Sequence, residues 1–572
     1  MKRGTIQILA ALLTLVWIRL LLAVFYFDTP IPIGPISDSW IYFGLGRWFG
    51  ATGTMPAEAV FHPPLYPYLL GWIFRRFGPS PIPVLALQSL AGITWGLIVI
   101  RWTQRWAERS WMPWVTLGVL VFSATPVVMM EWRLLPETFA LLAEVAAIEA
   151  LWQLQKGTWP NLGSVIVSLI MAFLILLRPN FVLAVPIVWI WGFREHRKGR
   201  VSLGFFAWNI VVLAIVTAPI VARNHGWGAG IALSANSGIT FYQGNNPAAR
   251  GGYTQLPGVD SDVTRQNEDA RRQSGEGDLQ TSDHHWWREG ATFLAGNPGR
   301  AALLALRKGG LFVNPTEPGG DIPFLFERQR LPVLYPLGTL NFTVLLLLAI
   351  VAVRFGRKKK TPWGLFAGWG AVSFATCMLF YVNGRYRLPI WPILVFLSVL
   401  GLEEGVKRRK EPVVWLVLLA LPAMIWIGWR VPTAPRTQVT GWHNWGTAWE
   451  HFGFVERALP SYRNALAIDP GHRPTLENMS RVYLAVPRID RAKTVLTELI
   501  TRHPDSFVGH NNLAVVYLLE RTWDEAISEA TIALRLRPGN KAAEFNLRRA
   551  RELKSISVIG RRKAMLQGPI SR

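Results

Sequence analysis

Long apolar runs are the feature of this sequence that most constrains its fold. Hydrophobic residues make up 51% of the 572 residues, and the mean hydropathy is positive. Runs of about 17–25 apolar residues recur over roughly the first three quarters of the chain, and each is long enough to cross the hydrocarbon core of a bilayer. Soluble proteins of this size rarely carry so much apolar surface. The sequence therefore predicts an all-α, polytopic membrane protein in the plasma (inner) membrane.

About eleven membrane-spanning helices follow from these runs. The candidate spans lie near residues 7–27, 81–101, 111–129, 137–154, 161–177, 180–193, 202–221, 332–353, 363–381, 387–402 and 412–429. Arg178-Pro179-Asn180 and Pro186 interrupt the pair between 161 and 193, which forms either two crossings or one re-entrant pair. Both readings leave the sidedness of every other loop unchanged.

Basic residues set the orientation of these spans. The net charge is +24, and clusters such as RFGRKKK at 354–360 and KRRK at 407–410 lie between apolar runs. Cytoplasmic loops carry such an excess of Lys and Arg, so we expect the N-terminus inside, with Lys2 and Arg3. The first apolar run is too long for a signal peptide and lacks a small-residue cleavage site, which favours an uncleaved first span.

The same placement argues against nucleic-acid binding, because the charge belongs to loops between spans. Cys377 is the only cysteine, so the chain builds neither a disulfide framework nor a thiolate zinc site. Three regions are then expected outside the cytoplasm: the outer loops 28–80 and 223–330, and everything after about 430. Group transfer on that face requires a donor that crossed the membrane attached to lipid.

The last part of the chain, about 439–556, has the texture of soluble helical repeats. Three prolines, Pro470, Pro504 and Pro538, stand 34 residues apart. Small residues precede each proline at two fixed offsets: Ala458, Ala492 and Ala526, and before them Gly446, Ser480 and Ala514. This pattern resembles about three tetratricopeptide repeats, which form a concave binding surface. Such repeats either recruit a partner or polymer, or act as a stabilising lid on the membrane domain.

The first outer loop presents a carboxylate directly beyond the first span. The stretch ISDSWIY at 36–42 leads into an amphipathic aromatic helix suited to the membrane interface. Pro63-Pro64-Leu65-Tyr66-Pro67 then begins a second such helix. An acid, a tyrosine a few residues on and this proline-rich stretch resemble the first outer loop of GT-C glycosyltransferases. The closest likeness is to the protein O-mannosyltransferase and lipid A aminoarabinose transferase group.

Further matches follow in the same order along residues 1–405. They are Leu135-Pro136-Glu137-Thr138, Arg178-Pro179, Arg223-Asn224, Gly244-Asn245-Asn246-Pro247 and Asn383-Gly384-Arg385-Tyr386-Arg387-Leu388-Pro389. The resemblance implies a GT-C-like domain over about 1–430 that transfers a sugar from a polyprenyl phosphate to a glycan, lipid or protein acceptor. The sugar and the acceptor stay open.

The resemblance also implies roles for particular side chains. Asp38 and Glu137 are candidate catalytic carboxylates, since a positioned carboxylate can take the acceptor proton. Both also stand where an acid would simply cap a helix. Tyr42, His62 and Tyr66 are candidate substrate contacts, although a histidine at the interface often has no such role.

Four arginines are candidates for binding the donor phosphate, because a guanidinium grips phosphate oxygens in a bidentate fork. They are Arg385, Arg387, Arg178 and Arg223. The alternative is that these side chains anchor the ends of spans at the membrane surface. No cofactor is predicted, and any divalent metal requirement is left open.

Two acidic motifs are set aside. Asp260-Ser261-Asp262 fits the pattern that holds a metal in nucleotide-sugar enzymes, but such sugars are absent from the outer face. Asp283-His284-His285 has no regular metal-ligand spacing. The sequence also lacks a P-loop and a dinucleotide-binding glycine motif. Two other functions remain open: an O-antigen polymerase or ligase, and a non-catalytic scaffold or transporter accessory that recruits envelope proteins through its repeats.

Overall fold

The computed structural model describes most of the chain, and all of its regular structure there is helical. The described residues are 3–32, 36–123, 130–157, 160–254, 256, 263–275, 277–316, 324–331, 334–337, 339–356, 361–430 and 435–566. They form two compact units, Met1–Pro432 and Thr433–Arg572. The assignment of residues 1–430 to a membrane domain and of 439–556 to a repeat domain stays a prediction.

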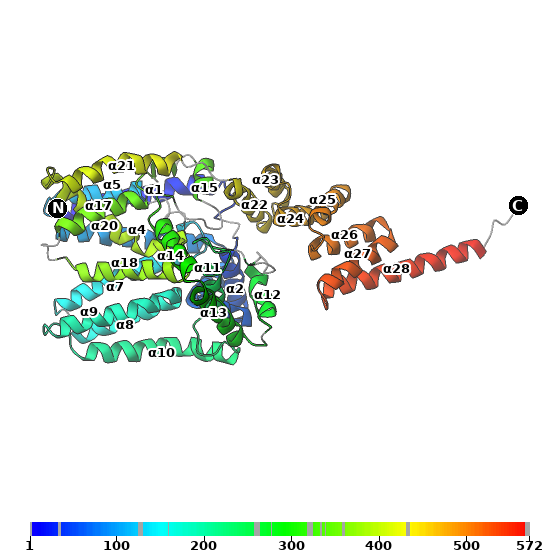
Figure 1. Ribbon diagram of the computed structural model, residues 1–572, viewed down its shortest axis with the longest axis horizontal. Coiled ribbons are helices and arrows are strands. Elements are labelled where there is room, and N and C mark those ends of the chain that lie inside the picture. The colour runs from blue at the N-terminus through cyan, green and yellow to red at the C-terminus, as the bar shows by residue number, and fades with distance from the viewer. Residues whose placement is uncertain are drawn as a thin grey trace. The chain divides into compact units, whose positions relative to one another are not determined.

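The first unit is a bundle of long helices with shorter helices at one end (Figure 1). Its helices as far as residue 226 are α1 (Arg3–Tyr26), α2 (Asp38–Thr52), η1 (Ala57–Phe61), α3 (Leu65–Phe77), α4 (Ile82–Trp106), α5 (Met112–Phe122), α7 (Glu137–Gln155), α8 (Pro160–Leu177), η2 (Pro179–Leu183), α9 (Ala184–His196) and α10 (Gly204–Gly226). The remainder are α11 (Ser237–Gly244), α12 (Val263–Ser274), α13 (Leu279–Gly296), α14 (Pro298–Phe312), α15 (Phe324–Arg330), α16 (Leu334–Leu337), α17 (Phe342–Phe355), α18 (Trp363–Leu379), α19 (Gly384–Arg387), η4 (Leu388–Ile390), α20 (Trp391–Lys407) and α21 (Pro412–Arg430).

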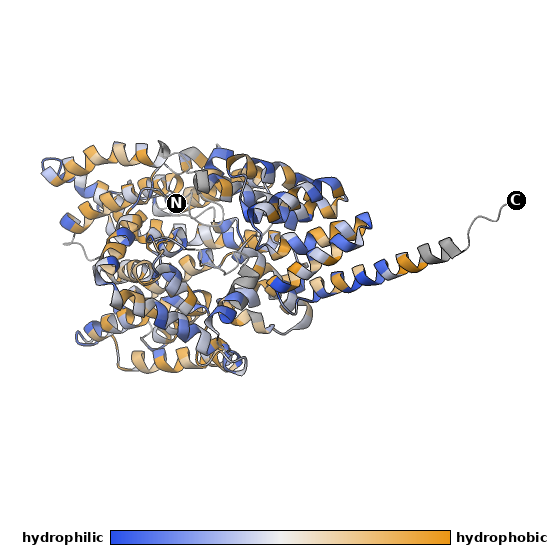
Figure 2. Cartoon of the chain, turned by 45° about the vertical axis from the view of Figure 1, so that its right-hand side comes forward, coloured by the Kyte–Doolittle hydropathy of each residue, from blue (hydrophilic) through white to orange (hydrophobic). Residues whose placement is uncertain are grey.

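Helix α4 lies at the centre of the bundle, where it packs against α1, α5, α7 and α20. Helices α17 and α20 approach each other very closely. A Cβ atom at Gly401 would lie 1.9 Å from the carbonyl oxygen of Leu348, so only glycine fits at this crossing. Figure 2 shows apolar colouring along most helices of this unit.

Each of the eleven expected spans overlaps a helix, but fewer helices are plainly long and apolar enough to cross a membrane. Four of the described helices meet both criteria, at Arg3–Tyr26, Ile82–Trp106, Gly204–Gly226 and Gly384–Lys407. Five more are apolar but shorter: Met112–Phe122, Asn161–Leu177, Phe342–Phe355, Trp363–Leu379 and Pro412–Gly428. The structure thus agrees with a membrane protein, whereas the number of about eleven crossings stays a prediction. Three acids in α7, Glu137, Glu144 and Glu149, reduce the hydropathy of that helix.

Elements of the two expected outer loops gather at one end of the bundle. Helix α2 packs against α3 and α12, and α11 packs against α13. In Figure 1, α2, α11, α12 and α13 lie together at one end of the long helices, and the N-terminus lies at the opposite end. Segments far apart in the sequence therefore meet on the same side of the bundle.

The second unit is a series of paired helices. They are α22 (Pro435–His451), α23 (Val455–Ile468), α24 (Arg473–Ala485), α25 (Ile489–Arg502), α26 (Phe507–Glu520), α27 (Trp523–Leu536) and α28 (Lys541–Leu566). Each helix packs against the next along the chain. Helices α23, α25 and α27 each end just before one of the three periodic prolines, as expected for a residue that cannot continue a helix.

The periodic small residues lie inside this unit. Ala458, Ala492, Ala526, Ser480 and Ala514 are each 0% exposed. Large side chains from neighbouring helices, such as Leu476, Leu496 and Leu513, form the core around them. The expected tetratricopeptide-like helical repeats are therefore confirmed by their own packing.

We expect Ala492→Leu to destabilise the second unit by about 1–3 kcal/mol, because the added atoms have no space at a fully buried position. The exposed Ala542 offers the same substitution as a control. Thermal unfolding of both variants, followed by circular dichroism, tests this packing. Equal stabilities for the two variants would contradict it.

Candidate functional site

Arg385 lies between the two candidate catalytic carboxylates. Its Nη1 donates to Asp38 Oδ2 at 2.5 Å, and its Nε donates to Glu137 Oε1 at 2.5 Å. The three residues come from α2, α7 and α19, which are separated by about 100 and 250 residues in the sequence. The structure thus brings together residues that only the order of short motifs had connected.

Arg178 completes a cluster of two acids and two guanidinium groups. It precedes η2, and its Nη1 donates to the same oxygen of Glu137 at 2.8 Å. Its guanidinium lies 5.3 Å from the ring centre of Tyr386. The side chain of Glu137 is only 3% exposed, so two cations compensate a nearly buried charge. Its second oxygen, Oε2, is buried and has no hydrogen-bond partner among the described residues.

Both acids stand at the first residue of a helix, where the helix dipole favours negative charge. Asp38 is the first residue of α2 and Ser37 is its N-cap, with a left-handed φ of 50°. The carboxylate of Asp38 reaches Arg385 across the bundle. Asp38 is therefore not the N-cap of α2, and its carboxylate binds Arg385 instead.

Aromatic side chains adjoin the cluster. The ring of Tyr42 lies 5.8 Å from that of His62 and 5.2 Å from that of Tyr66, in edge-to-face arrangements. The hydroxyl of Tyr66 donates to Gln88 Oε1 at 2.6 Å. Apart from the larger effect of burial, the charge of Asp38 raises the pKa of Tyr42 and of His62, so both lie near that carboxylate, and Tyr66 joins them through the ring of Tyr42.

Gln88 is a residue that the sequence analysis missed. It is 0% exposed, and its Nε2 donates to the backbone carbonyls of Glu131 at 2.9 Å and Arg133 at 2.7 Å. A single buried amide therefore fixes Tyr66 relative to the turn that precedes α7. The only signal in the sequence was one glutamine within an apolar span.

The surroundings of Asp38 and His62 shift the pKa values of both side chains. Burial raises the pKa of Asp38, but the charge and hydrogen bond of Arg385, together with the charges of His62 and Arg178, lower it by more in sum, so the net shift is below the ordinary value. Burial lowers the pKa of His62, against the opposing effect of Asp38. At neutral pH, Asp38 is therefore ionised and His62 is neutral.

Two of the four candidate phosphate-binding arginines lie elsewhere. The side chain of Arg387 is buried, and its Nη1 donates to the carbonyls of Phe312 at 3.0 Å and Asn314 at 2.9 Å. Arg223 donates to the Tyr68 hydroxyl at 3.2 Å and to Asn224 Oδ1. Both have protein partners away from Asp38, while Arg178 and Arg385 lie in the cluster.

One of the two acidic motifs that were set aside lies among the described residues. Asp260-Ser261-Asp262 lies outside the described residues. Asp283 accepts from Ser237 Oγ at 2.7 Å and from the amide of Gly238 at 2.6 Å, which ties α13 to α11. Within the described part of the chain, no group of three or more His, Cys, Asp or Glu residues is placed to hold a metal ion.

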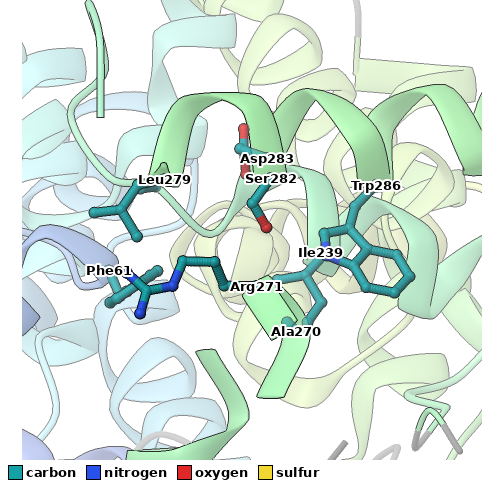
Figure 3. A pocket seen from close by; sticks show the side chains of 9 residues that line it. Phe61, Ile239, Ala270, Arg271, Leu279, Ser282, Asp283 and Trp286 are labelled. Atoms are coloured by element: carbon teal, nitrogen blue, oxygen red, sulfur yellow. The ribbon is translucent and has the colours of Figure 1, made fainter. Parts of the chain in front are cut away.

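Asp283 also lines a pocket between η1, α11, α12 and α13 (Figure 3). Phe61, Ile239, Leu279 and Trp286 form its apolar walls. Its empty volume, which includes open solvent, is about 260 Å³. This volume is below the usual range for small-molecule sites. Phe61, which lines the pocket, directly precedes His62 in the sequence.

The repeat unit carries a second periodic feature that the sequence analysis missed. Asparagines recur every 34 residues, at Asn444, Asn478, Asn512 and Asn546. Asn478 donates to Thr447 of the preceding repeat at 3.1 Å, and Asn546 donates to Asn511 at 3.0 Å. These amides therefore lie where the first helices of neighbouring repeats meet.

Comparisons with known proteins leave the family open. No protein-family model matches the chain, and no curated protein sequence matches it. Among solved structures, the P58(IPK) TPR domain is 11% identical with a TM-score of 0.22, covering 72% of this chain and 99% of that chain. The APC/C hetero-tetramer Cut9-Hcn1 is 14% identical with a TM-score of 0.20, covering 79% and 98%. At such scores these likenesses support no conclusion, and the repeat architecture rests on the helix packing described above.

The electrostatics of Asp38 predict a pH dependence. If Asp38 accepts the acceptor proton, kcat/KM should show no acid limb between pH 7 and about pH 4, because Arg385 keeps the carboxylate ionised. In Arg385→Gln, burial acts on Asp38 without the main effect that opposes it, so the limb should move to higher pH. The profile of residual transfer activity measures this shift.

Arg223→Gln is the matched control, because Arg223 donates hydrogen bonds to Tyr68 and Asn224 and not to Asp38. Its profile should keep the acid limb of the native protein. An unchanged limb in Arg385→Gln would show that Asp38 is not the titrating base.

Proposed function

We propose that this chain is an integral-membrane glycosyltransferase that moves a sugar from a polyprenyl-phosphate donor to an acceptor on the outer face of the membrane. The observation that carries the proposal is the sharing of Arg385 by Asp38 and Glu137. A base and a phosphate-binding cation are the two groups that this transfer requires, and here they are in contact.

The position of the cluster supports a lipid-linked donor. Asp38 begins α2, which packs against the aromatic helix α3 at the end of the bundle opposite the N-terminus (Figure 1). Under the positive-inside rule, that end faces outward, and the basic loops and the N-terminus face the cytoplasm. A prenyl chain in the bilayer would then present its phosphate at the level of the cluster. In this topology the repeat unit is also extracytoplasmic.

The reaction is a displacement at the anomeric carbon of the donor sugar. The acceptor oxygen forms a bond to that carbon while the bond between the carbon and the phosphate oxygen breaks. Asp38 takes the acceptor proton, and the polyprenyl phosphate leaves with the electron pair. A base positioned in this way contributes about 10²–10⁴-fold in rate.

The cations have the complementary task. Arg385 and Arg178 can stabilise the negative charge that develops on the leaving phosphate, since guanidinium groups pair bidentately with phosphate oxygens. Glu137 holds both cations through one oxygen. We assign Glu137 an orienting role, with Oε2 available to accept a hydrogen bond from a substrate hydroxyl. Tyr42, His62 and Tyr66 form the adjoining wall against which the sugar would lie.

The repeat unit would recruit the acceptor or a protein partner. Asn478 and Asn546 lie between successive first helices, and an amide can both donate to and accept from an extended peptide backbone. A solenoid presents such groups at regular intervals along one surface. The alternative role, a lid on the membrane unit, requires no such polar row.

We expect Asp38→Asn to lower sugar transfer by about 10²–10⁴-fold, because the amide cannot accept the proton. The measurement is mass spectrometry of envelope lipids, glycans and glycoproteins from a deletion strain complemented with each variant. The missing hexose or pentose would identify the donor and acceptor.

Asp28→Asn is the matched control, since Asp28 lies in the same outer loop with an exposed side chain. It should restore the native glycan profile. If Asp38→Asn also restored the profile, the enzyme proposal would fail and the non-catalytic scaffold would be favoured. Dependence on outer-loop arginines but not on Asp38 would favour the polymerase or ligase.

A further inference from the structure

The segment 380–387, which joins α18 to α20, presents Arg385 to the carboxylates. Tyr381 and Tyr386 lie in the same segment, with their rings 5.5 Å apart. Two buried cations fix its ends. Lys308 of α14 binds the end at Phe380, and Arg387 forms the other end.

The ammonium group of Lys308, a residue of α14, lies at the C-terminal end of α18. Its Nζ donates to the carbonyls of Met378 at 2.9 Å and Phe380 at 2.6 Å, and to Asn245 Oδ1 at 2.9 Å. The last carbonyls of a helix have no partner within the helix and carry partial negative charge. Lys308 therefore caps α18 from a neighbouring helix.

Arg387 makes the reverse contact. Its Nη1 donates to the carbonyls of Leu311, Phe312 and Asn314, which end α14. Its guanidinium also lies 4.3 Å from the ring centre of Phe342. Helix α14 thus caps α18 through Lys308, and the segment after α18 caps α14 through Arg387.

Close backbone contacts hold the same segment. A Cβ atom at Gly244 would lie 1.9 Å from the carbonyl oxygen of Phe380. The amide of Val382 donates to the carbonyl of Gly251 at 2.9 Å, and Asn245 Nδ2 donates to the carbonyl of Leu379 at 2.8 Å. Residues 244–251 of the outer loop 223–330 therefore contact the chain immediately before Arg385.

The cost of burying Lys308 indicates that its contacts serve more than stability. The side chain is 1% exposed, and its hydrogen bonds go to neutral oxygens. Burial accordingly lowers the pKa of Lys308 to about 8. A buried charge is tolerated only with close polar partners, and the three acceptors of Lys308 all lie beside the start of the segment 380–387.

We propose that Lys308 is a positioning residue of the candidate site: with Arg387 it forms a reciprocal cap between α14 and α18 that holds Arg385 against Asp38 and Glu137. The role of Lys308 in sugar transfer rests on the proposed function, whereas its ordering of the segment 380–387 does not. Misplacement of a catalytic group by about 1 Å can cost on the order of 10²-fold in rate.

Lys308→Met in the full-length protein, reconstituted in lipid nanodiscs, tests the proposal. Hydrogen–deuterium exchange of peptides covering 380–388 should accelerate at least about 10-fold, since the capping bonds that order the segment are lost. With a polyprenyl-phosphate sugar as substrate, we expect kcat/KM to fall by about 10–100-fold. The melting temperature should fall, because the carbonyls of Met378 and Phe380 lose a hydrogen-bond donor.

Lys407→Met is the matched control. Lys407 ends α20, is 27% exposed and pairs with Glu108 and Glu404. This substitution should leave the exchange of 380–388 and the transfer rate unchanged. Asn245→Ala removes one partner of Lys308 and should change both measurements in the same direction as Lys308→Met, which keeps the test decisive if Lys308→Met does not fold.

Native exchange of 380–388 in Lys308→Met would overturn the proposal, whatever the activity. Accelerated exchange with native kcat/KM would also overturn it, because Lys308 would then be a structural cap only. If the native protein transfers no sugar but Lys308→Met loosens 380–388, the proposed function fails while the reciprocal cap stands.

Discussion

The interaction on which the rest of the site depends is the contact of one guanidinium with two carboxylates. Glu137 is nearly buried, and a charge removed from water is tolerated only with a close partner of opposite sign. Arg385 and Arg178 provide those partners from distant parts of the sequence. Packing of α2, α7 and the segment before α20 in any other arrangement would leave an unpaired charge. The electrostatic requirement and the fold therefore specify the same arrangement of helices.

The sequence predicted the members of the cluster better than their roles. Asp38, Glu137, Arg178 and Arg385 were all candidates, because each lies in a short motif that resembles those of GT-C glycosyltransferases. The sequence did not separate Arg385 from Arg387. Arg385 and Arg387 are two residues apart on a helical turn, so their side chains point in nearly opposite directions. One therefore meets the carboxylates and the other meets the end of α14.

Residues whose partners are backbone atoms could not be predicted. Lys308 and Gln88 bind carbonyl groups, and a carbonyl carries no signature in the sequence. The repeats were predictable for the opposite reason, since their packing recurs with a fixed period that small residues and prolines mark. The number of spans was harder, because α7 combines three acids with an apolar face. Those acids are one reason why hydropathy alone does not identify it as a span.

The cluster as described is electrically balanced, with two carboxylates and two guanidinium groups. Under the proposed reaction, a donor phosphate brings further negative charge and competes with Asp38 for Arg385. Loss of that ion pair would raise the pKa of Asp38, since burial then acts without its main opposing charge. A carboxylate with a higher pKa is a stronger base. Donor binding would therefore strengthen the base at the moment when an acceptor proton has to be removed, and without donor the ion pair keeps Asp38 weakly basic.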